Sequence, residues 1–265
     1  MVKLCSIASG SSGNCIYAGC DSTHLLVDAG ISGKRIEQGL KSIAVTPSDL
    51  SGIFVTHEHV DHIQGLGVLA RRYHLPIYAT YETLCAVMSS SGVGKIDEAL
   101  LHPIKPDEPL EVGDIRVNPF SISHDAANPV CYTFEAEGHK IGMATDLGTY
   151  DSYILEKLSG SEILYLEANH DVNMLMVGSY PYALKQRILG AKGHLSNENS
   201  ARLVCELLHD GLKNVILAHL SKENNYAELA YETVRCEVDA HTTRGHAPAI
   251  CVANRDVPTE AAVLI

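Results

Sequence analysis

Residues 55–62 read VTHEHVDH, and no other stretch constrains what the chain can form as strongly. The apolar run before it predicts a strand that ends just before His57. His57 and His59 are two residues apart, so in extended backbone both side chains point to one side, where a single metal ion can take both. Asp61 and His62 follow at an expected helix start. Their side chains project from a different surface and suit a second ion nearby.

A surface cluster of histidines without function is the ordinary alternative. With 14 histidines among 265 residues, this pattern of three histidines and one aspartate arises in roughly one unrelated sequence of this length in a few hundred to a thousand. The pattern therefore favours a metal site.

Short apolar strands alternate with helical stretches along the rest of the chain. We expect strands at residues 25–30, 52–57, 76–80, 115–124, 130–138, 140–146, 162–168 and 214–220, and helices at 36–43, 63–74, 198–211 and 227–238. In five of the strands the apolar residues run directly into a potential ligand: Asp28, His57, His124, Asp146 and His219. This regularity predicts one rim of a sheet that collects polar side chains from several strand ends.

Composition indicates a globular protein with one sizeable core. The hydrophobic content is 46%, and no repeat or linker marks a boundary, so we expect a single domain over residues 1–265. No segment approaches the ~18 uninterrupted apolar residues of a membrane span, and the eight cysteines form no CxxC pair. We therefore expect a cytoplasmic protein with reduced thiols and no membrane association. The net charge of −12 argues against a broadly basic nucleic-acid-binding surface, although a local basic strip remains open.

The strand-end residues and the VTHEHVDH stretch together resemble, in order and approximate spacing, the five motifs of the metallo-β-lactamase fold. The resemblance implies an α/β fold, a four-layer αββα sandwich, with a dinuclear metal site at the rim between the sheets. It implies that three residues hold one ion, three hold the second and one carboxylate holds both: His57, His59 and His124; Asp61, His62 and His219; and Asp146. Asp28 would orient the site, as residues around metal ligands commonly do.

Two further strings resemble the nucleic-acid-processing branch of this fold. EILYLEANHD ends a strand at Glu167, and GHLSN places His194 before a helix. In that branch the paired acid and histidine donate a proton to the leaving group. Together with the opening GSSGN, these strings are most similar to the YycJ/WalJ group of bacterial exonuclease-like proteins. The chain departs from the branch in lacking a β-CASP insertion and a flexible basic tRNA-binding arm, and in being acidic.

The resemblance implies a dinuclear metal-dependent phosphodiesterase, a DNA exonuclease that uses a metal-bound hydroxide oriented by Asp61, with His194 held by Glu167 as the proton donor. Zinc is favoured by the histidine-rich ligands, with manganese or iron as alternatives. A thioester, lactone or lactam hydrolase on the same site is the second interpretation, and a non-catalytic metal-binding or scaffold protein is the third. The motifs do not distinguish DNA from RNA, and they do not indicate the oligomeric state.

Four more residues have a possible role in substrate binding, with an ordinary alternative for each. Backbone amides of the GSSGN loop can cradle a phosphate, which would place Ser11 and Asn14 at the substrate, but a tight turn explains them equally well. Asn169 and His170 either line the pocket or hydrogen-bond within their loop. The remaining histidines have no metal-like spacing and are expected to be core or surface residues: His24, His74, His102, His139, His209, His241 and His246.

Overall fold

The computed structural model describes residues 1–242 and 247–264, so His246 lies outside the described residues. The chain forms two compact units. The first contains Met1–Ser121, Ala126–His139 and the residues from Asn254 onward, and the second contains Ile122–Asp125 and Lys140–Ala253. The single domain expected from the sequence stays a prediction.

The first unit contains a mixed seven-stranded sheet in the order β14-β1-β2-β3-β4-β5-β6. Its β1, β2, β3 and β14 pair antiparallel, whereas β3 to β6 run parallel. The strands are β1 (Val2–Ala8), β2 (Cys15–Gly19), β3 (His24–Val27), β4 (Leu50–Phe54), β5 (Ile77–Thr80), β6 (Leu101–Ile104) and β14 (Ala262–Leu264). An antiparallel ladder in the same unit joins β7 (Leu110–Val112), β8 (Ile115–Ser121) and β9 (Val130–Ala136).

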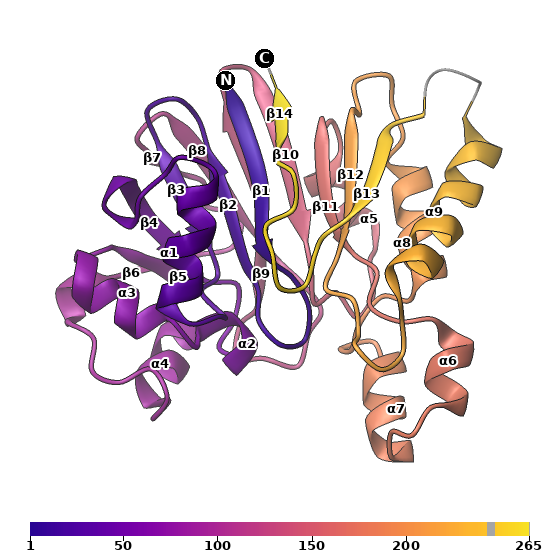
Figure 1. Ribbon diagram of the computed structural model, residues 1–265, viewed down its shortest axis with the longest axis horizontal. Coiled ribbons are helices and arrows are strands. Elements are labelled where there is room, and N and C mark those ends of the chain that lie inside the picture. Colours follow the sequence, from indigo (N-terminus) through magenta and orange to yellow (C-terminus); the bar gives the residue numbers. More distant parts are fainter. Residues whose placement is uncertain (243–246, 265) are drawn as a thin grey trace. The chain divides into compact units, whose positions relative to one another are not determined.

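Helices of the first unit pack apolar side chains onto the seven-stranded sheet (Figure 1). Ile36 and Leu40 of one helix and Leu69 of another are fully buried in a cluster with sheet residues such as Leu26 and Ile53. Burying such side chains contributes about 1.5–3 kcal/mol each, so this cluster is a main source of the unit's stability. The helices are α1 (Gly33–Ser42), α2 (Val60–Ile63), α3 (Leu66–Tyr73) and α4 (Tyr81–Ser89), with short 3-10 turns at Pro47–Asp49 and Glu98–Leu100.

The second unit is built on four parallel strands. They are β10 (His139–Ala144), β11 (Ile163–Glu167), β12 (Asn214–Ala218) and β13 (Ala249–Val252). Every residue of β11 is buried, and so is nearly all of β12. Strands covered on both faces have continuous apolar runs of this kind, which is how ILYL and VILA read in the sequence.

Residues 140–242 and 247–253 of the second unit include five helices: α5 (Ser152–Leu158), α6 (Val172–Val177), α7 (Tyr182–Leu189), α8 (Asn197–Glu206) and α9 (Ala227–His241). α8 and α9 pack side by side, and α9 also contacts β13 (Figure 1). α6 and α7 lie away from this pair, and α7 has no buried residue. Among residues 1–242 and 247–264, no helix combines the length and the apolar character that crossing a bilayer requires.

The eight strands predicted from apolar runs are all present, with ends that shift by up to three residues. The four predicted helices are present as well, although the 63–74 stretch is divided, with Ile63 ending α2 and α3 beginning at Leu66, and the helix predicted at 198–211 ends at Glu206. The predicted ranges missed the strands β1, β2, β6, β7, β13 and β14, and the helices α4 to α7. Capping residues mark three of these helices, because Thr80, Asp151 and Asp171 each accept a backbone N–H of the first turn.

All eight cysteines are free thiols, and they differ sharply in burial. Burial raises the pKa of Cys5 to about 11, so its thiol stays protonated at neutral pH. We expect Ellman's reagent to label three thiols rapidly in the native protein, since Cys85, Cys236 and Cys251 are exposed and the thiolate is the reactive form. Cys5 and the fully buried Cys15 should react only after denaturation. Rapid native labelling of either would contradict this assignment.

Candidate metal centre

The ends of β3 and β4 bring the first site residues to one edge of the sheet. Val27 pairs with Phe54 in the parallel register, and the amide N–H of Asp28 donates to the Phe54 carbonyl oxygen over 2.8 Å. Asp28 then turns into the left-handed region with φ of 59°. The chain therefore leaves β3 after Val27 and β4 after Phe54 at the same edge of the sheet, as the apolar runs predicted.

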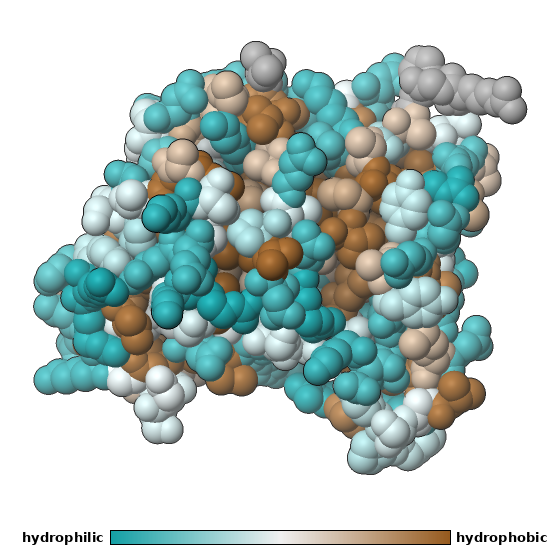
Figure 2. All heavy atoms as spheres, in the orientation of Figure 1, coloured by the Kyte–Doolittle hydropathy of each residue, from teal (hydrophilic) through white to brown (hydrophobic). Residues whose placement is uncertain are grey.

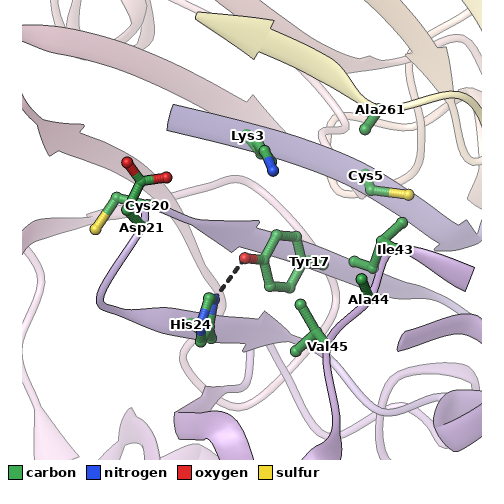
Figure 3. Close-up of a pocket in the computed structure, with 10 residues that line it drawn as sticks. All are labelled: Lys3, Cys5, Tyr17, Cys20, Asp21, His24, Ile43, Ala44, Val45 and Ala261. Carbon is green, nitrogen blue, oxygen red and sulfur yellow. Dashed lines mark hydrogen bonds between the residues drawn. The ribbon is translucent and has the colours of Figure 1, made fainter. Parts of the chain in front are cut away.

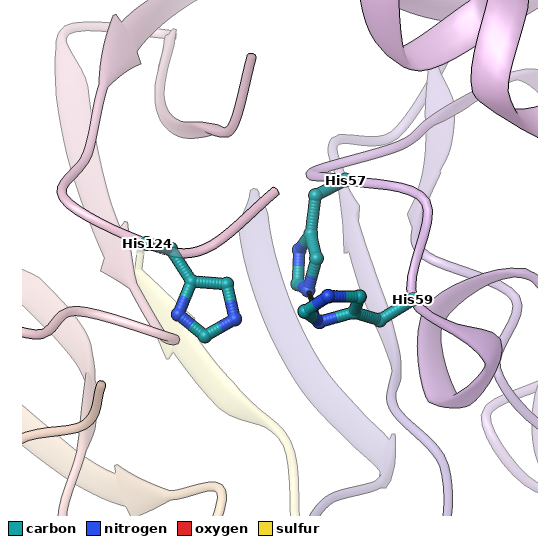
Figure 4. Close-up of side chains that lie close together, drawn as sticks. All are labelled: His57, His59 and His124. Carbon is teal, nitrogen blue, oxygen red and sulfur yellow. Dashed lines mark hydrogen bonds between the residues drawn. The ribbon is translucent and has the colours of Figure 1, made fainter. Parts of the chain in front are cut away.

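His57 and His59 converge as their two-residue spacing predicts. Nε2 of His57 lies 2.9 Å from Nδ1 of His59 (Figure 4). Two nitrogens that each lie about 2.0–2.1 Å from one tetrahedral zinc ion are roughly 3.3 Å apart. The observed separation is close to that value, so the pair fits a shared ion. His57 is fully buried, whereas His59 is half-buried at the start of α2.

Asp28 holds the third histidine of the stretch. Nδ1–H of His62 donates to Oδ2 of Asp28 over 2.7 Å, and both side chains are fully buried. The Thr56 hydroxyl lies 2.9 Å from the same carboxylate oxygen and 3.0 Å from Nδ1 of His57. Thr56 thus connects Asp28 to two histidines. The sequence analysis did not single out Thr56, although its position between the strand end and His57 indicates a residue close to the predicted ligands.

Asn14 lies beside Asp61 and His62. Its side-chain nitrogen is 3.4 Å from Oδ2 of Asp61 and 3.2 Å from Nε2 of His62, and its own oxygen accepts the Gly10 amide N–H. Gly30 permits this close packing, because a Cβ there would lie 1.6 Å from the backbone oxygen of Asp61. Asn14 therefore borders the predicted ligands.

The second unit gathers its site residues in the same way. Ala144 pairs with Leu166, and Glu167 pairs with Ala218, so the carboxyl ends of β10, β11 and β12 are level. Asp146, Glu167 and His219 follow or end these strands and are all buried. Asp146 and His219 have φ of 56° and 55°. A left-handed backbone costs a residue other than glycine about 1–2 kcal/mol, so the surrounding structure must enforce it.

Glu167 contacts two histidines with one oxygen. Nδ1–H of His194 and Nδ1–H of His219 donate to its Oε1 over 2.8 and 2.9 Å. Its Oε2 accepts the amide N–H groups of Leu147 and Leu195. Sequence reasoning expected only the partnership with His194. The contact with His219 joins residues 52 positions apart, which no local pattern could indicate.

These contacts shift two pKa values. Burial alone would raise the pKa of Glu167, but attraction to His194 and hydrogen bonds from His194 and His219 lower it far below its usual range. Burial lowers the pKa of His194, and the Glu167 carboxylate more than reverses this, so the pKa of His194 is raised overall. Glu167 is therefore ionised at neutral pH, and His194 holds a proton more readily than a free histidine does.

His124 is fixed by the backbone that precedes His194. Its Nδ1 lies 3.2 Å from the Gly193 carbonyl oxygen, and its Nε2 lies 3.8 Å from Oδ1 of Asp146. Nδ1–H of His124 donates to that carbonyl, so in the neutral ring the lone pair is on Nε2.

Four predicted histidine ligands share one pattern, in which Nδ1 of the ring contacts a protein oxygen. The partner oxygens belong to Thr56, Asp28, Gly193 and Glu167, for His57, His62, His124 and His219 respectively. Metal-ligating histidines almost always have such a partner, which fixes the tautomer and raises the basicity of the ligand. The donor set therefore fits divalent ions that bind imidazole and carboxylate.

Four side chains of the second unit also form a compact cluster of their own. One donor atom from each of Asp146, Glu167, His194 and His219 lies within 4.8 Å of the others. The cluster is suited to a divalent metal. Because Nδ1 of both histidines faces the Glu167 carboxylate, these contacts also have the geometry of hydrogen bonds.

The other residues predicted to bind substrate lie in two loops. The Asn169 amide nitrogen donates to the backbone oxygen of His219 over 2.9 Å. Burial lowers the pKa of His170 to about 4, so its ring is neutral at pH 7, and its Nδ1 lies 3.3 Å from Oδ1 of Asn169. Both side chains thus make hydrogen bonds within the loop. Ser11 is exposed in a turn of the GSSGN loop.

A hollow of about 170 Å³ in the first unit contains none of the predicted site residues. Tyr17 and His24 meet in it through a 2.7 Å hydrogen bond between the hydroxyl and Nδ1 (Figure 3). His24 was expected to be an ordinary histidine, and its partner here is a tyrosine. Burial raises the pKa of Tyr17 to about 12, so the phenol is protonated.

The chain belongs to the metallo-β-lactamase superfamily, because the model of the β-lactamase superfamily domain matches residues 23–242. The solved structure of the metallo-β-lactamase fold protein YhfI from Bacillus subtilis superposes with a TM-score of 0.70, at 17% identity, over 98% of this chain and 100% of that one. The predicted fold class is confirmed.

Within the superfamily, the chain groups with the YycJ and WalJ proteins. It is 43% identical to exodeoxyribonuclease YycJ of Bacillus anthracis over 228 residues, which cover 86% of each protein. It is also 43% identical to exodeoxyribonuclease WalJ of Streptococcus pneumoniae, over 88% of this chain and 86% of the relative. The resemblance inferred from the motifs is confirmed.

Proposed function

We propose that the protein is a dinuclear metal-dependent phosphodiesterase that removes nucleotides from the end of a DNA strand. The observation that carries this proposal is the pairing of His194 with Glu167. The carboxylate is fully buried, whereas the His194 side chain is 20% exposed, so one ring edge is anchored and the other is available. The names of the YycJ and WalJ relatives support a DNA substrate.

The proposed metal ligands are the seven residues expected from the sequence: His57, His59 and His124 for one ion, Asp61, His62 and His219 for the other, and Asp146 for both. Divalent ions held by these residues would supply Lewis acidity to the phosphoryl oxygens and lower the pKa of a nucleophilic water. We assign zinc as the preferred ion because imidazole predominates, with manganese or iron as the alternatives. Asp28 and Thr56 fix the rings of His62 and His57.

His194 would act on the leaving group. Its Nδ1–H donates to Glu167, so a proton on Nε2 is the one available to the departing oxygen. A nucleotide alkoxide is a poor leaving group near neutral pH, and a positioned acid accelerates its departure by ~10²–10⁴-fold. Asp61 would orient the attacking water, with Asn14 beside it. Contacts of Ser11, Asn169 and His170 with substrate remain part of the proposal, and we place the activity in the cytoplasm.

A substrate comparison tests the proposal. We expect the purified protein to degrade labelled DNA from an end and to hydrolyse bis-p-nitrophenyl phosphate. A chelator should abolish both activities, and added zinc or manganese should restore them. Single- and double-stranded DNA and RNA, a thioester and a β-lactam should be compared by kcat/KM at one salt concentration, since binding to nucleic acid depends on salt. If the protein cleaves none of the nucleic acids but hydrolyses the thioester rapidly, it is a small-acyl hydrolase instead.

A further inference from the structure

Helices α6 and α7 form an arm that ends close to the proposed proton donor. We call residues 172–192 the helical arm. Asp171 caps its first helix by accepting the Met174 amide N–H over 2.7 Å. At its other end, the amide N–H of His194 donates to the Ile188 carbonyl oxygen over 3.0 Å. The arm therefore begins five residues after Glu167 and is hydrogen-bonded directly to the backbone of His194.

The arm exposes apolar and aromatic side chains. Val177 is 86% exposed and Tyr182 is 73% exposed, while Met176 and Leu189 are also exposed and α7 buries nothing. Figure 2 shows apolar and polar surface side by side where these helices lie. Leu175 is the one buried side chain of residues 172–192, all of which the structure describes, so the arm has little apolar core of its own.

The arm also differs from the rest of the chain in charge. Residues 172–197 contain Lys185, Arg187 and Lys192 and no aspartate or glutamate, the longest acid-free run in a protein whose net charge is −12. Nζ of Lys185 donates to the carbonyl oxygens of Met176 and Gly178 over 2.7 Å each, which ties α7 to α6. Lys192 is exposed and makes no hydrogen bond or ion pair within residues 1–242 and 247–264.

Arg187 connects the arm to a predicted ligand. It forms an ion pair with Asp125, whose other carboxylate oxygen lies 3.5 Å from Nε2 of His124. A basic, aromatic segment thus reaches from solvent to residues of the proposed centre within one unit. A polyanion would be repelled by most of this acidic chain and attracted here.

We propose that the helical arm grips the unpaired end of a DNA strand. The exposed Tyr182 and the half-buried Tyr180, on either side of Pro181, would stack on bases, and Lys192 would contact a phosphate. Charge complementarity selects this occupant, because the arm carries a formal charge of +3 without an acid. Stacking requires unpaired bases, since the bases of a duplex are already stacked on one another. Stacking platforms combined with basic residues are the usual way of holding single strands.

The inference rests on the proposed function, and a comparison of two substrates tests it. We expect the double variant Tyr180→Ala/Tyr182→Ala to lower the ratio of kcat/KM on single-stranded DNA to kcat/KM on bis-p-nitrophenyl phosphate by about 10- to 100-fold, mainly through KM. Lys192→Glu should also lower the ratio and should reduce the slope of log KM against log salt by about 0.7 or more. The small diester cannot span the arm, so it reports on the centre alone.

Matched controls are available far from the arm in sequence. Tyr81→Ala removes a tyrosine that is 66% exposed, and Lys105→Glu reverses an exposed lysine. Neither should change the ratio. An unchanged ratio in the arm variants would overturn the inference even if the protein degrades DNA. If the arm variants leave the ratio unchanged but change the molar mass measured by light scattering, the arm instead contacts a second copy of the chain.

A binding measurement separates failure of the inference from failure of the proposed function. The probe is a fluorescent single-stranded phosphorothioate oligothymidylate, added to the metal-loaded protein. If the wild-type protein degrades no DNA but binds this probe about 10-fold or more tightly than the double tyrosine variant does, the cleavage proposal fails and the arm inference stands. If the wild-type protein and the variant bind the probe equally, the arm inference is overturned.

Discussion

His57→Ala and His62→Ala are each expected to lose bound metal and at least ~10³-fold of kcat/KM on both bis-p-nitrophenyl phosphate and DNA. Each removes an Nε2 donor whose ring is already fixed by Thr56 or Asp28. Metal content per chain should be measured by elemental analysis after metal loading, beside the rates. The parent protein should hold up to two ions per chain.

The matched control is His102→Ala, which removes an exposed histidine outside the motif. It should keep the metal content and rate of the parent. A parent protein without metal after loading would show that the site assignment is wrong. A His57→Ala variant that retains two ions would remove His57 from the ligand set.

His194→Ala and Glu167→Ala are expected to separate proton donation from metal binding. His194→Ala should keep its metal and cleave DNA at least ~10²-fold more slowly, yet retain much of its activity on the nitrophenyl diester. The reason is the leaving group, because p-nitrophenolate is a stable anion near neutral pH and needs little protonation. Metal content and the two kcat values are the measurements.

Glu167→Ala should have the broader effect of the two. Its Oε1 accepts from His219 as well as from His194, so the variant loses the oxygen that fixes a proposed metal ligand. Loss of such a partner typically costs 10–100-fold in metal affinity, and the activity on both substrates should therefore fall. Glu156→Ala, which changes an exposed acid of α5, is the control.

The two variants also test the alternative use of the cluster formed by Asp146, Glu167, His194 and His219. If a metal ion binds these four residues directly, His194→Ala will lose metal and will slow both substrates equally. Retained metal with selective loss on DNA supports the donor assignment. Equal losses with retained metal would instead mean that His194 binds the phosphate.

The candidate site was largely predictable because its residues follow apolar runs that form parallel strands. In parallel sheets the carboxyl ends of the strands meet at one edge, so Asp28, Asp146 and His219 could be assigned to strand ends from local sequence alone. The two-residue spacing of His57 and His59 likewise predicted that their nitrogens would converge. These inferences need only strand geometry.

Other features were not predictable from local pattern. α7 buries no residue, and its eight-residue sequence has only a short apolar pattern, Leu184 and Ile188, which does not distinguish a helix from a loop. The hydrogen bond between His219 and Glu167 depends on the register of β11 and β12, which a single sequence does not encode locally. The arrangement of Thr56 between Asp28 and His57 needs the fold of the strand end in three dimensions.

The left-handed backbone at Asp28, Asp146 and His219 has a consequence for protein engineering. Glycine would relieve the strain at each position, but it would also delete a side chain of the proposed centre. A laboratory selection for heat resistance alone would reward such replacements and would enrich well-folded, inert proteins. A stabilisation campaign on this scaffold should therefore score turnover in every round and exclude these three codons from the library.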